Sequence, residues 1–185
     1  STRLQIGQIV RVPPLPYADS PAPKPETIIS HSDAQMMRNA IIYKDNDIIV
    51  LNKPAGLAVQ GGSGQTRHID GLADALRFGM SSKPKLVHRL DKDTSGVFVM
   101  ARTGRAAAGL AKSFHQRTTR KIYWAVVVGN PMPRVGTIRY GLVKALGHGP
   151  NGAGERMHCI HPNEVEHTNG AKRATTDFAV IESMG

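Results

Sequence analysis

The sequence has little cysteine, few aromatic residues and no long apolar run. Cys159 is its single cysteine among 185 residues, which excludes an internal disulfide framework and favours a reducing compartment. No apolar run reaches the roughly 18–20 residues that span a bilayer, and no signal peptide is recognisable. These absences predict a soluble intracellular protein, in the cytoplasm or, for a eukaryotic chain, in the mitochondrial matrix.

Acidic residues are also scarce, since 14 Asp and Glu stand against 24 Lys and Arg and give a net charge of +10. A strongly basic chain favours polyanionic partners, RNA or DNA first. The cations are spread through apolar segments rather than gathered in a tail. The length fits one domain, or one domain with an appendage.

The first half of the chain shows a connector followed by regular elements. Six of the twelve prolines lie in residues 13–25, which predicts an extended segment without a core of its own. A helical turn is expected over residues 33–39. Apolar runs at 41–43 and 48–51 flank a polar turn, a pattern typical of a β-hairpin. An aspartate cap and a terminal glycine predict a helix over residues 70–79.

The most distinctive stretch is a polar loop within residues 85–102, between two apolar runs that predict strands. Arg89 and Lys92 surround Asp91 and Asp93, and such cations favour ionised carboxylates and can hold phosphate. The loop is therefore either a positioned carboxylate in a basic setting or an ion-paired surface turn. A Mg²⁺-dependent phosphoryl-transfer site on the two aspartates is a weaker alternative, because the flanking cations suit a divalent ion poorly.

A basic helix is expected after this loop. Thr103 can cap it, and apolar residues follow at the i, i+3, i+4, i+7 spacing of a buried helical stripe. The other face and the exit of this helix carry five cations: Arg105, Lys112, Arg117, Arg120 and Lys121. These cations form either an ordinary solvated face or an RNA-backbone contact, and their position next to the polar loop favours RNA.

Residues 122–128 alternate two apolar faces and predict the strongest strand of the chain. By itself, Tyr123 is more typical of a packed sheet aromatic than of a site residue. Shorter strands are expected over residues 136–140 and 175–181.

The nine residues HRLDKDTSG, from His88 to Gly96, resemble the signature loop of the RluA-like family of RNA pseudouridine synthases. Three further segments resemble the same family: NKPAGL after the second strand, KIYWAVVVG around Tyr123, and AKRA with the strand after it. The similarity covers most of the chain from about Ile41. It implies isomerisation of uridine to pseudouridine in structured RNA, most plausibly large-subunit ribosomal RNA, with no metal, nucleotide or redox cofactor.

The resemblance also assigns roles to individual residues. Asp91 would be the catalytic residue, Tyr123 would stack on the target base, and Arg89 would fill the vacated space in the RNA or hold a phosphate. The expected site consists of catalytic Asp91 and the RNA- or substrate-binding residues His88, Arg89, Thr94, Arg117, Arg120, Lys121 and Tyr123.

The expected architecture is an α+β domain over residues 40–185, built on a mixed, largely antiparallel sheet with flanking helices and with its C-terminal strands missing. Residues 1–39 would be a Pro-rich linker after the tail of an S4-like RNA-binding module. The family's third motif, which supplies a basic partner for the catalytic aspartate, has no match here. We therefore expect the natural protein to be longer and this chain alone to be inactive or severely impaired. We expect a monomer, and a non-catalytic RNA-binding domain with the same fold is the alternative function.

Overall fold

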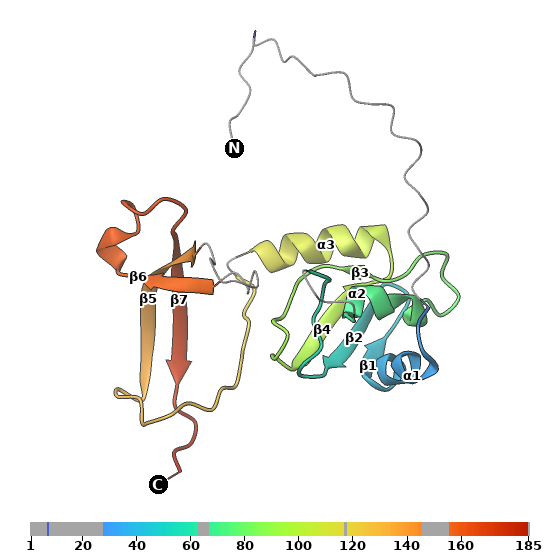
Figure 1. The fold of residues 1–185 in the computed structure, drawn as a ribbon, viewed down its shortest axis with the longest axis horizontal. Coiled ribbons are helices and arrows are strands. Elements are labelled where there is room, and N and C mark those ends of the chain that lie inside the picture. The colour runs from blue at the N-terminus through green and yellow to red at the C-terminus, as the bar shows by residue number, and fades with distance from the viewer. Residues whose placement is uncertain (1–6, 8–27, 63–66, 117, 146–155, 185) are drawn as a thin grey trace, which may run out of the picture. The chain divides into compact units, whose positions relative to one another are not determined.

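The computed structural model describes residue 7 and residues 28–62, 67–116, 118–145 and 156–184, and it shows an α+β architecture (Figure 1). The described residues form two compact units, which are divided between residues 116 and 117. Helices and antiparallel sheets occur as expected for the fold class, but the strands are divided between two separate sheets.

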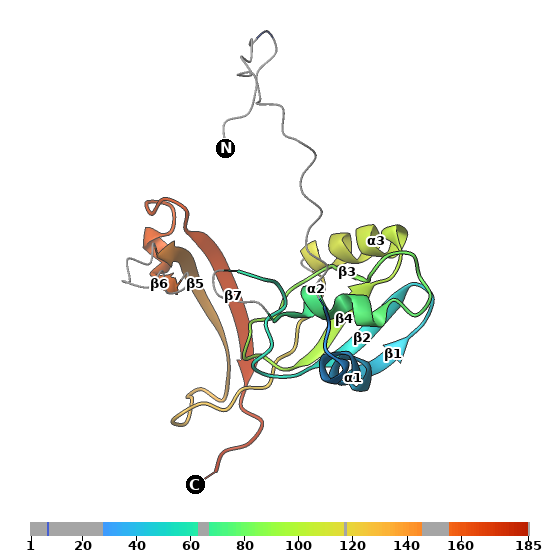
Figure 2. The ribbon, with the colours of Figure 1, turned by 45° about the vertical axis from the view of Figure 1, so that its right-hand side comes forward.

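The first unit contains a four-stranded sheet of order β1-β2-β4-β3, in which every neighbouring pair is antiparallel. Figures 1 and 2 show α1 beside β1 and α3 beside β3. The elements of this unit are α1 (His31–Asn39), β1 (Ile41–Lys44), β2 (Ile48–Lys53), α2 (Ile69–Leu72), η1 (Ala73–Leu76), β3 (Lys85–Leu86), β4 (Gly96–Ala101) and α3 (Gly104–His115).

The core of the first unit lies on one face of β2 and β4. Ile49 and Leu51 of β2 stand opposite Met100 and Phe98 of β4, and all four are buried. Because side chains alternate between the faces of a strand, one register brings these four residues together. Leu57, Val59, Ile69, Leu72 and Leu76 complete the cluster from the following loop, α2 and η1.

Helix α1 belongs to this core. Ser30 caps it by accepting a hydrogen bond from the Asp33 amide at 3.1 Å, and Met37 is only 1% exposed. The predicted helical turn is confirmed, but it packs onto the hydrophobic cluster rather than continuing the linker expected over residues 1–39. Residues 1–6 and 8–27, with the expected S4-like piece, lie outside the described residues.

The helix expected over residues 70–79 is shorter than predicted and starts earlier. His68 caps it through Nδ1, which accepts from the Gly71 amide at 3.0 Å, and the α-helical turn passes into the 3₁₀ turn η1. Thr103 caps α3 as predicted, because its Oγ1 accepts from the Ala106 amide at 3.1 Å.

The second unit contains a three-stranded antiparallel sheet of order β6-β5-β7. Its elements are β5 (Val135–Ala145), β6 (Arg156–Ile160), the 3₁₀ turn η2 (Pro162–Glu164) and β7 (Lys172–Ala179). The strands expected at 136–140 and 175–181 are confirmed with longer or shifted bounds.

The prediction of a strand over residues 122–128 is wrong. This segment has no strand assignment, and its large apolar side chains are open to solvent, with Trp124 86% and Val126 95% exposed. A strand exists only where a neighbour supplies ladder hydrogen bonds, and none of the strands in the described part of the chain pairs with this segment. Periodicity identified a sequence able to form a strand, but it did not identify a partner for that strand.

Candidate active site

The predicted signature loop connects the antiparallel strands β3 and β4. Asp91 is exposed in it, and the Asp91 carbonyl accepts from the Thr94 amide at 3.2 Å, which closes a turn. Gly96 follows at φ 111°, a region that glycine reaches without a Cβ penalty, and β4 begins there. The loop therefore presents the Asp91 carboxylate to solvent from a hydrogen-bonded turn.

A buried lysine lies behind this loop. Lys53 is the last residue of β2 and is 0% exposed. Its Nζ donates to the carbonyls of Leu57 at 2.7 Å, Lys92 at 2.8 Å and Pro54 at 2.9 Å. Lys92 belongs to the signature loop, so one ammonium group joins the two loops that follow β2 and β3.

Burial and nearby carboxylates act on this lysine in opposite directions. Burial lowers the pKa of the Lys53 ammonium below the ordinary lysine value, while the charges of Asp93 and Asp91 favour its protonated form. The buried ammonium therefore comes from a different strand than the signature loop that carries these aspartates.

Sequence reasoning missed Lys53 as a site residue. The signal was present in the period of β2, because Ile49, Leu51 and Lys53 stand two residues apart and all three are buried. Lysine is rarely buried, and a buried ammonium group needs an acceptor for each of its N–H donors.

His88 has a packed ring. It stacks on Phe114 of α3 with centroids 4.2 Å apart and lies against Phe98 of β4 at 4.6 Å. The Val99 amide donates to His88 Nε2 at 2.9 Å, so this nitrogen carries no proton. His88 thus fixes the entry to the signature loop against β4 and α3, and its expected contact with RNA stays a prediction.

The other expected site residues differ in how the structure places them. Arg89 is exposed on the signature loop, and Thr94 is half-buried there. Arg120 and Lys121 are exposed, but they belong to the second unit, as does Tyr123. Arg117 lies outside the described residues. The structure therefore brings together His88, Arg89, Asp91 and Thr94 on the signature loop, whereas Arg120, Lys121 and Tyr123 belong to the second unit.

Tyr123 lies in the unpaired segment before β5 and is 60% exposed. It is not a packed sheet aromatic in this structure, which was the ordinary alternative for an aromatic residue in a predicted strand. An exposed ring is available for stacking, and the expected base contact of Tyr123 stays a prediction.

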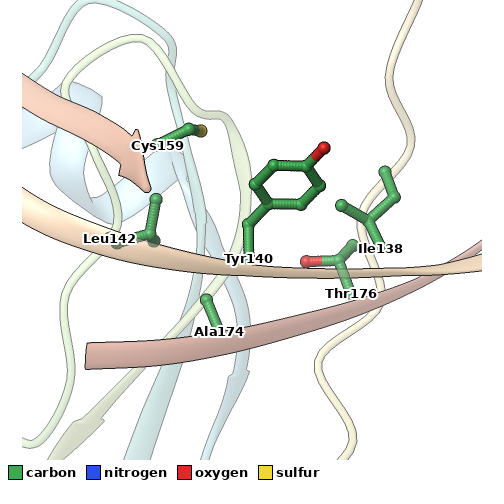
Figure 3. A pocket seen from close by; sticks show the side chains of 6 residues that line it. All are labelled: Ile138, Tyr140, Leu142, Cys159, Ala174 and Thr176. Atoms are coloured by element: carbon green, nitrogen blue, oxygen red, sulfur yellow. The ribbon is translucent and has the colours of Figure 1, made fainter. Parts of the chain in front are cut away.

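An open pocket with a volume of about 300 Å³ lies on the sheet of the second unit. Figure 3 shows Tyr140 in its middle, with Leu142 and Cys159 on one side and Ile138 and Thr176 on the other. Its lining holds no carboxylate and no cation. It contains no residue of the signature loop.

The described residues contain no group of three His, Cys, Asp or Glu side chains able to hold a metal ion. They also contain no helix long and apolar enough to cross a membrane.

Comparison with known proteins gives a consistent result. A family model described as RNA pseudouridylate synthase matches residues 47–184, which include the signature loop. "RNA pseudouridine synthase 4, mitochondrial" of Arabidopsis thaliana is 39% identical over 178 residues, covering 88% of this chain and 36% of that protein. "Ribosomal large subunit pseudouridine synthase C" of Vibrio cholerae is 38% identical over 136 residues, covering 69% of this chain and 40% of that protein.

A solved structure agrees with the sequence matches. The human RNA pseudouridylate synthase domain containing 4 aligns with a TM-score of 0.62 and 28% identity, over 82% of this chain and 57% of that one. The chain thus spans between about a third and a little over half of the length of these relatives.

Proposed function

The chain belongs to the RluA-like family of RNA pseudouridine synthases, and on this premise we propose that it isomerises uridine to pseudouridine in structured RNA. We propose large-subunit ribosomal RNA as the substrate class, which two observations support: the net charge of +10 and the name of the Vibrio cholerae relative. The observation that carries the proposal is the HRLDKDTSG loop, whose exposed Asp91 stands on a turn anchored by Lys53.

Asp91 is the proposed catalytic residue. Its carboxylate acts as a nucleophile or as a base that enables scission of the N1–C1′ bond of uridine. The freed uracil rotates, C5 forms the new bond to C1′, C5 loses its proton and N1 gains one. Substrate and product contain the same atoms, so the reaction itself consumes no oxidant, reductant or group donor.

The target base must leave its stack before Asp91 can reach it. Arg89, exposed on the same loop, is placed to fill the vacated space or to hold a phosphate. We propose that Tyr123 stacks on the flipped base and that His88 and Thr94 support the loop that receives it. Arg117, Arg120 and Lys121 are the proposed contacts to the RNA backbone.

We also propose a setting for the protein. We propose that the residues before α1 combine a linker with the tail of an S4-like module, and that α1 and residues 40–185 form the catalytic part, which acts as a monomer. The basic composition and the single cysteine support the cytoplasm, and the name of the Arabidopsis relative supports the mitochondrial matrix as the alternative.

Release of tritium tests the proposal, because C5 loses its hydrogen only if the new C–C bond forms. The protein is incubated with large-subunit ribosomal RNA transcribed with [5-³H]uridine, and tritium in water is counted. We expect release to reach one equivalent per modified site. RNA binding without any release, in this chain and in a form extended at its C-terminus, would favour the alternative of a non-catalytic RNA-binding domain.

A further inference from the structure

One face of the sheet in the second unit is apolar and open to solvent. Ile138 and Tyr140 of β5 and Met157 of β6 lie on it with exposed side chains. The opposite face is polar, since the Thr137 hydroxyl donates to the Asp177 carboxylate there at 2.6 Å. A sheet face in contact with water normally carries polar side chains, so the apolar face is a candidate interaction surface.

Tyr140 is the centre of this apolar face. It is 46% exposed and stands in the middle of the open pocket, with side chains of β5, β6 and β7 around it (Figure 3). The His161 ring contacts it edge-on, with the centroids 6.3 Å apart and the planes at 86°, which orients the tyrosine ring. An oriented and exposed aromatic ring is a platform on which a planar ligand can stack.

A cation lies next to this ring. In the register of β5 and β7, Leu142 stands opposite Lys172 and Tyr140 stands opposite Ala174. Lys172 and Tyr140 are therefore diagonal neighbours on one face, a relation in which residues are about 7–8 Å apart. Lys172 is exposed and makes no ion pair with any other described residue. Its ammonium group is thus available to an anion beside the ring.

The charge around the ring also favours an anion. A second pocket of about 290 Å³ shares Leu142 and Ala174 with the first, and its lining adds the three cations Lys144, Lys172 and Arg173. Arg173 is paired with Glu166 at 2.6 Å. Among the described residues, the linings of both pockets hold no carboxylate. A nucleotide matches this pair of pockets, because its planar base and its charged phosphate are joined in one unit.

We infer that this face binds a single-stranded segment of the substrate RNA, with one base stacked on Tyr140 and a phosphate held by Lys172. Aromatic rings beside cations are the usual way in which proteins hold single strands. The inference rests on the proposed function, which supplies RNA as the ligand. Because the pocket linings hold no carboxylate, the base bound here is not the one that is isomerised.

The single cysteine of the chain is a natural probe, since Cys159 is exposed and lines the pocket around Tyr140. The wild-type protein is treated with iodoacetamide, with and without a short oligouridine, and alkylation of Cys159 is followed by mass spectrometry. With the RNA at about ten times its dissociation constant, alkylation should slow about tenfold, because a covered thiol reacts only in the free protein. This measurement needs no variant and no activity.

A cysteine on the opposite face supplies the control. Thr175 is exposed and lies between two lining residues of β7, so its side chain points to the other face. In Thr175→Cys combined with Cys159→Ser, oligouridine should leave the alkylation rate unchanged. Failure of the wild type to bind oligouridine, or alkylation of Cys159 that RNA does not slow, would overturn the inference. Alkylation that slows with protein concentration alone would assign the face to a second copy of this chain, and would also overturn it.

Variants separate the two contacts. Tyr140→Ala should weaken oligouridine binding about tenfold, within the range for loss of a stacking aromatic, while Tyr140→Phe should bind like wild type because the ring remains. Lys172→Gln should reduce the slope of log K against log salt by about 0.7, the value for one phosphate of a single strand. Arg139→Gln is the matched control, because Arg139 is exposed and points to the opposite face of β5.

Failure of this inference can be distinguished from failure of the proposed function. Tritium release by the wild type without RNA protection of Cys159 would keep the enzyme and remove the binding face. Protection of Cys159 without tritium release would keep the binding face and remove the enzyme. A Tyr140→Ala protein that binds oligouridine as tightly as wild type would overturn the stacking contact and the inference with it.

Discussion

The proposed chemistry depends on individual residues. Substitutions of Tyr123 test whether its ring stacks on the target base. If the ring stacks on the flipped base, Tyr123→Phe should keep most turnover, because the ring face survives. Tyr123→Ala should weaken productive binding by about 1–3 kcal/mol, the usual cost of losing a stacking aromatic. Single-turnover rates over a range of enzyme concentration measure both effects.

The neighbouring Trp124 offers a matched control for this experiment, since it lies in the same exposed segment and is 86% exposed. Trp124→Ala should leave single-turnover rates near wild type if the contact belongs to Tyr123. If Tyr123→Phe and Tyr123→Ala both leave the single-turnover rate unchanged, Tyr123 does not belong to the site.

At the scale of elements, the β1–β2 hairpin depends on an ionised aspartate. Asp45 Oδ1 accepts from the amides of Asp47 at 2.8 Å and Ile48 at 2.7 Å. These two bonds lower the pKa of the Asp45 carboxyl in the folded protein, and the bond from the Ile48 amide has the larger effect. The contribution to stability is therefore complete above the unfolded-state pKa of about 3.9 and is lost as the pH falls through the lower folded value.

This sign gives a prediction for acid unfolding. The thermal unfolding midpoint of the wild type should fall as the pH drops from about 6 to about 3, and Asp45→Asn should reduce the size of that fall, because an amide oxygen accepts the same bonds at every pH. Asp74→Asn, which changes a surface carboxylate beside Arg77 at 2.7 Å, is the control. An identical pH dependence in Asp45→Asn and wild type would contradict the assignment.

Some of the secondary-structure elements could be predicted from the sequence and others could not. The β1–β2 hairpin, the β3–β4 strands around the signature loop and the Thr103 cap depend on local composition, and all three were predicted correctly. The strand at 122–128 was not, because pairing is a long-range property that periodicity does not report. Lys53 was missed because the strand was expected to end at residue 51, whereas β2 continues to Lys53, which stands opposite Gly96 of β4.

The family motif predicted which residues form the loop, but it did not predict how they are held. The placement of His88 between Phe98 and Phe114 required the position of α3, which is 16 or more residues away in the chain. The roles of Tyr123 and the basic residues near it remain predictions, since they belong to the second unit.

For the whole molecule, the net charge of +10 predicts binding to RNA that weakens steeply with salt, because bound cations release counterions from the phosphates. Changing Arg117, Arg120 and Lys121 together to Gln should reduce the slope of log K against log salt by about 2. Fluorescence anisotropy with a labelled RNA measures the slope.

Three other exposed cations of the second unit, Arg134, Arg139 and Arg173, provide the control. Their combined change to Gln should leave the slope close to wild type if the RNA follows the predicted path. An unchanged slope in the first triple variant would place the RNA elsewhere on the protein.

The most direct test of the account is tritium release by Asp91→Asn, measured in the longest natural form of the protein. The amide is nearly isosteric with the carboxylate but cannot act as a nucleophile or a base. We predict release below about 1% of wild type, with RNA affinity and unfolding midpoint close to wild type and with Asp74→Asn fully active. Release by Asp91→Asn near the wild-type rate would show that Asp91 is not the catalytic residue.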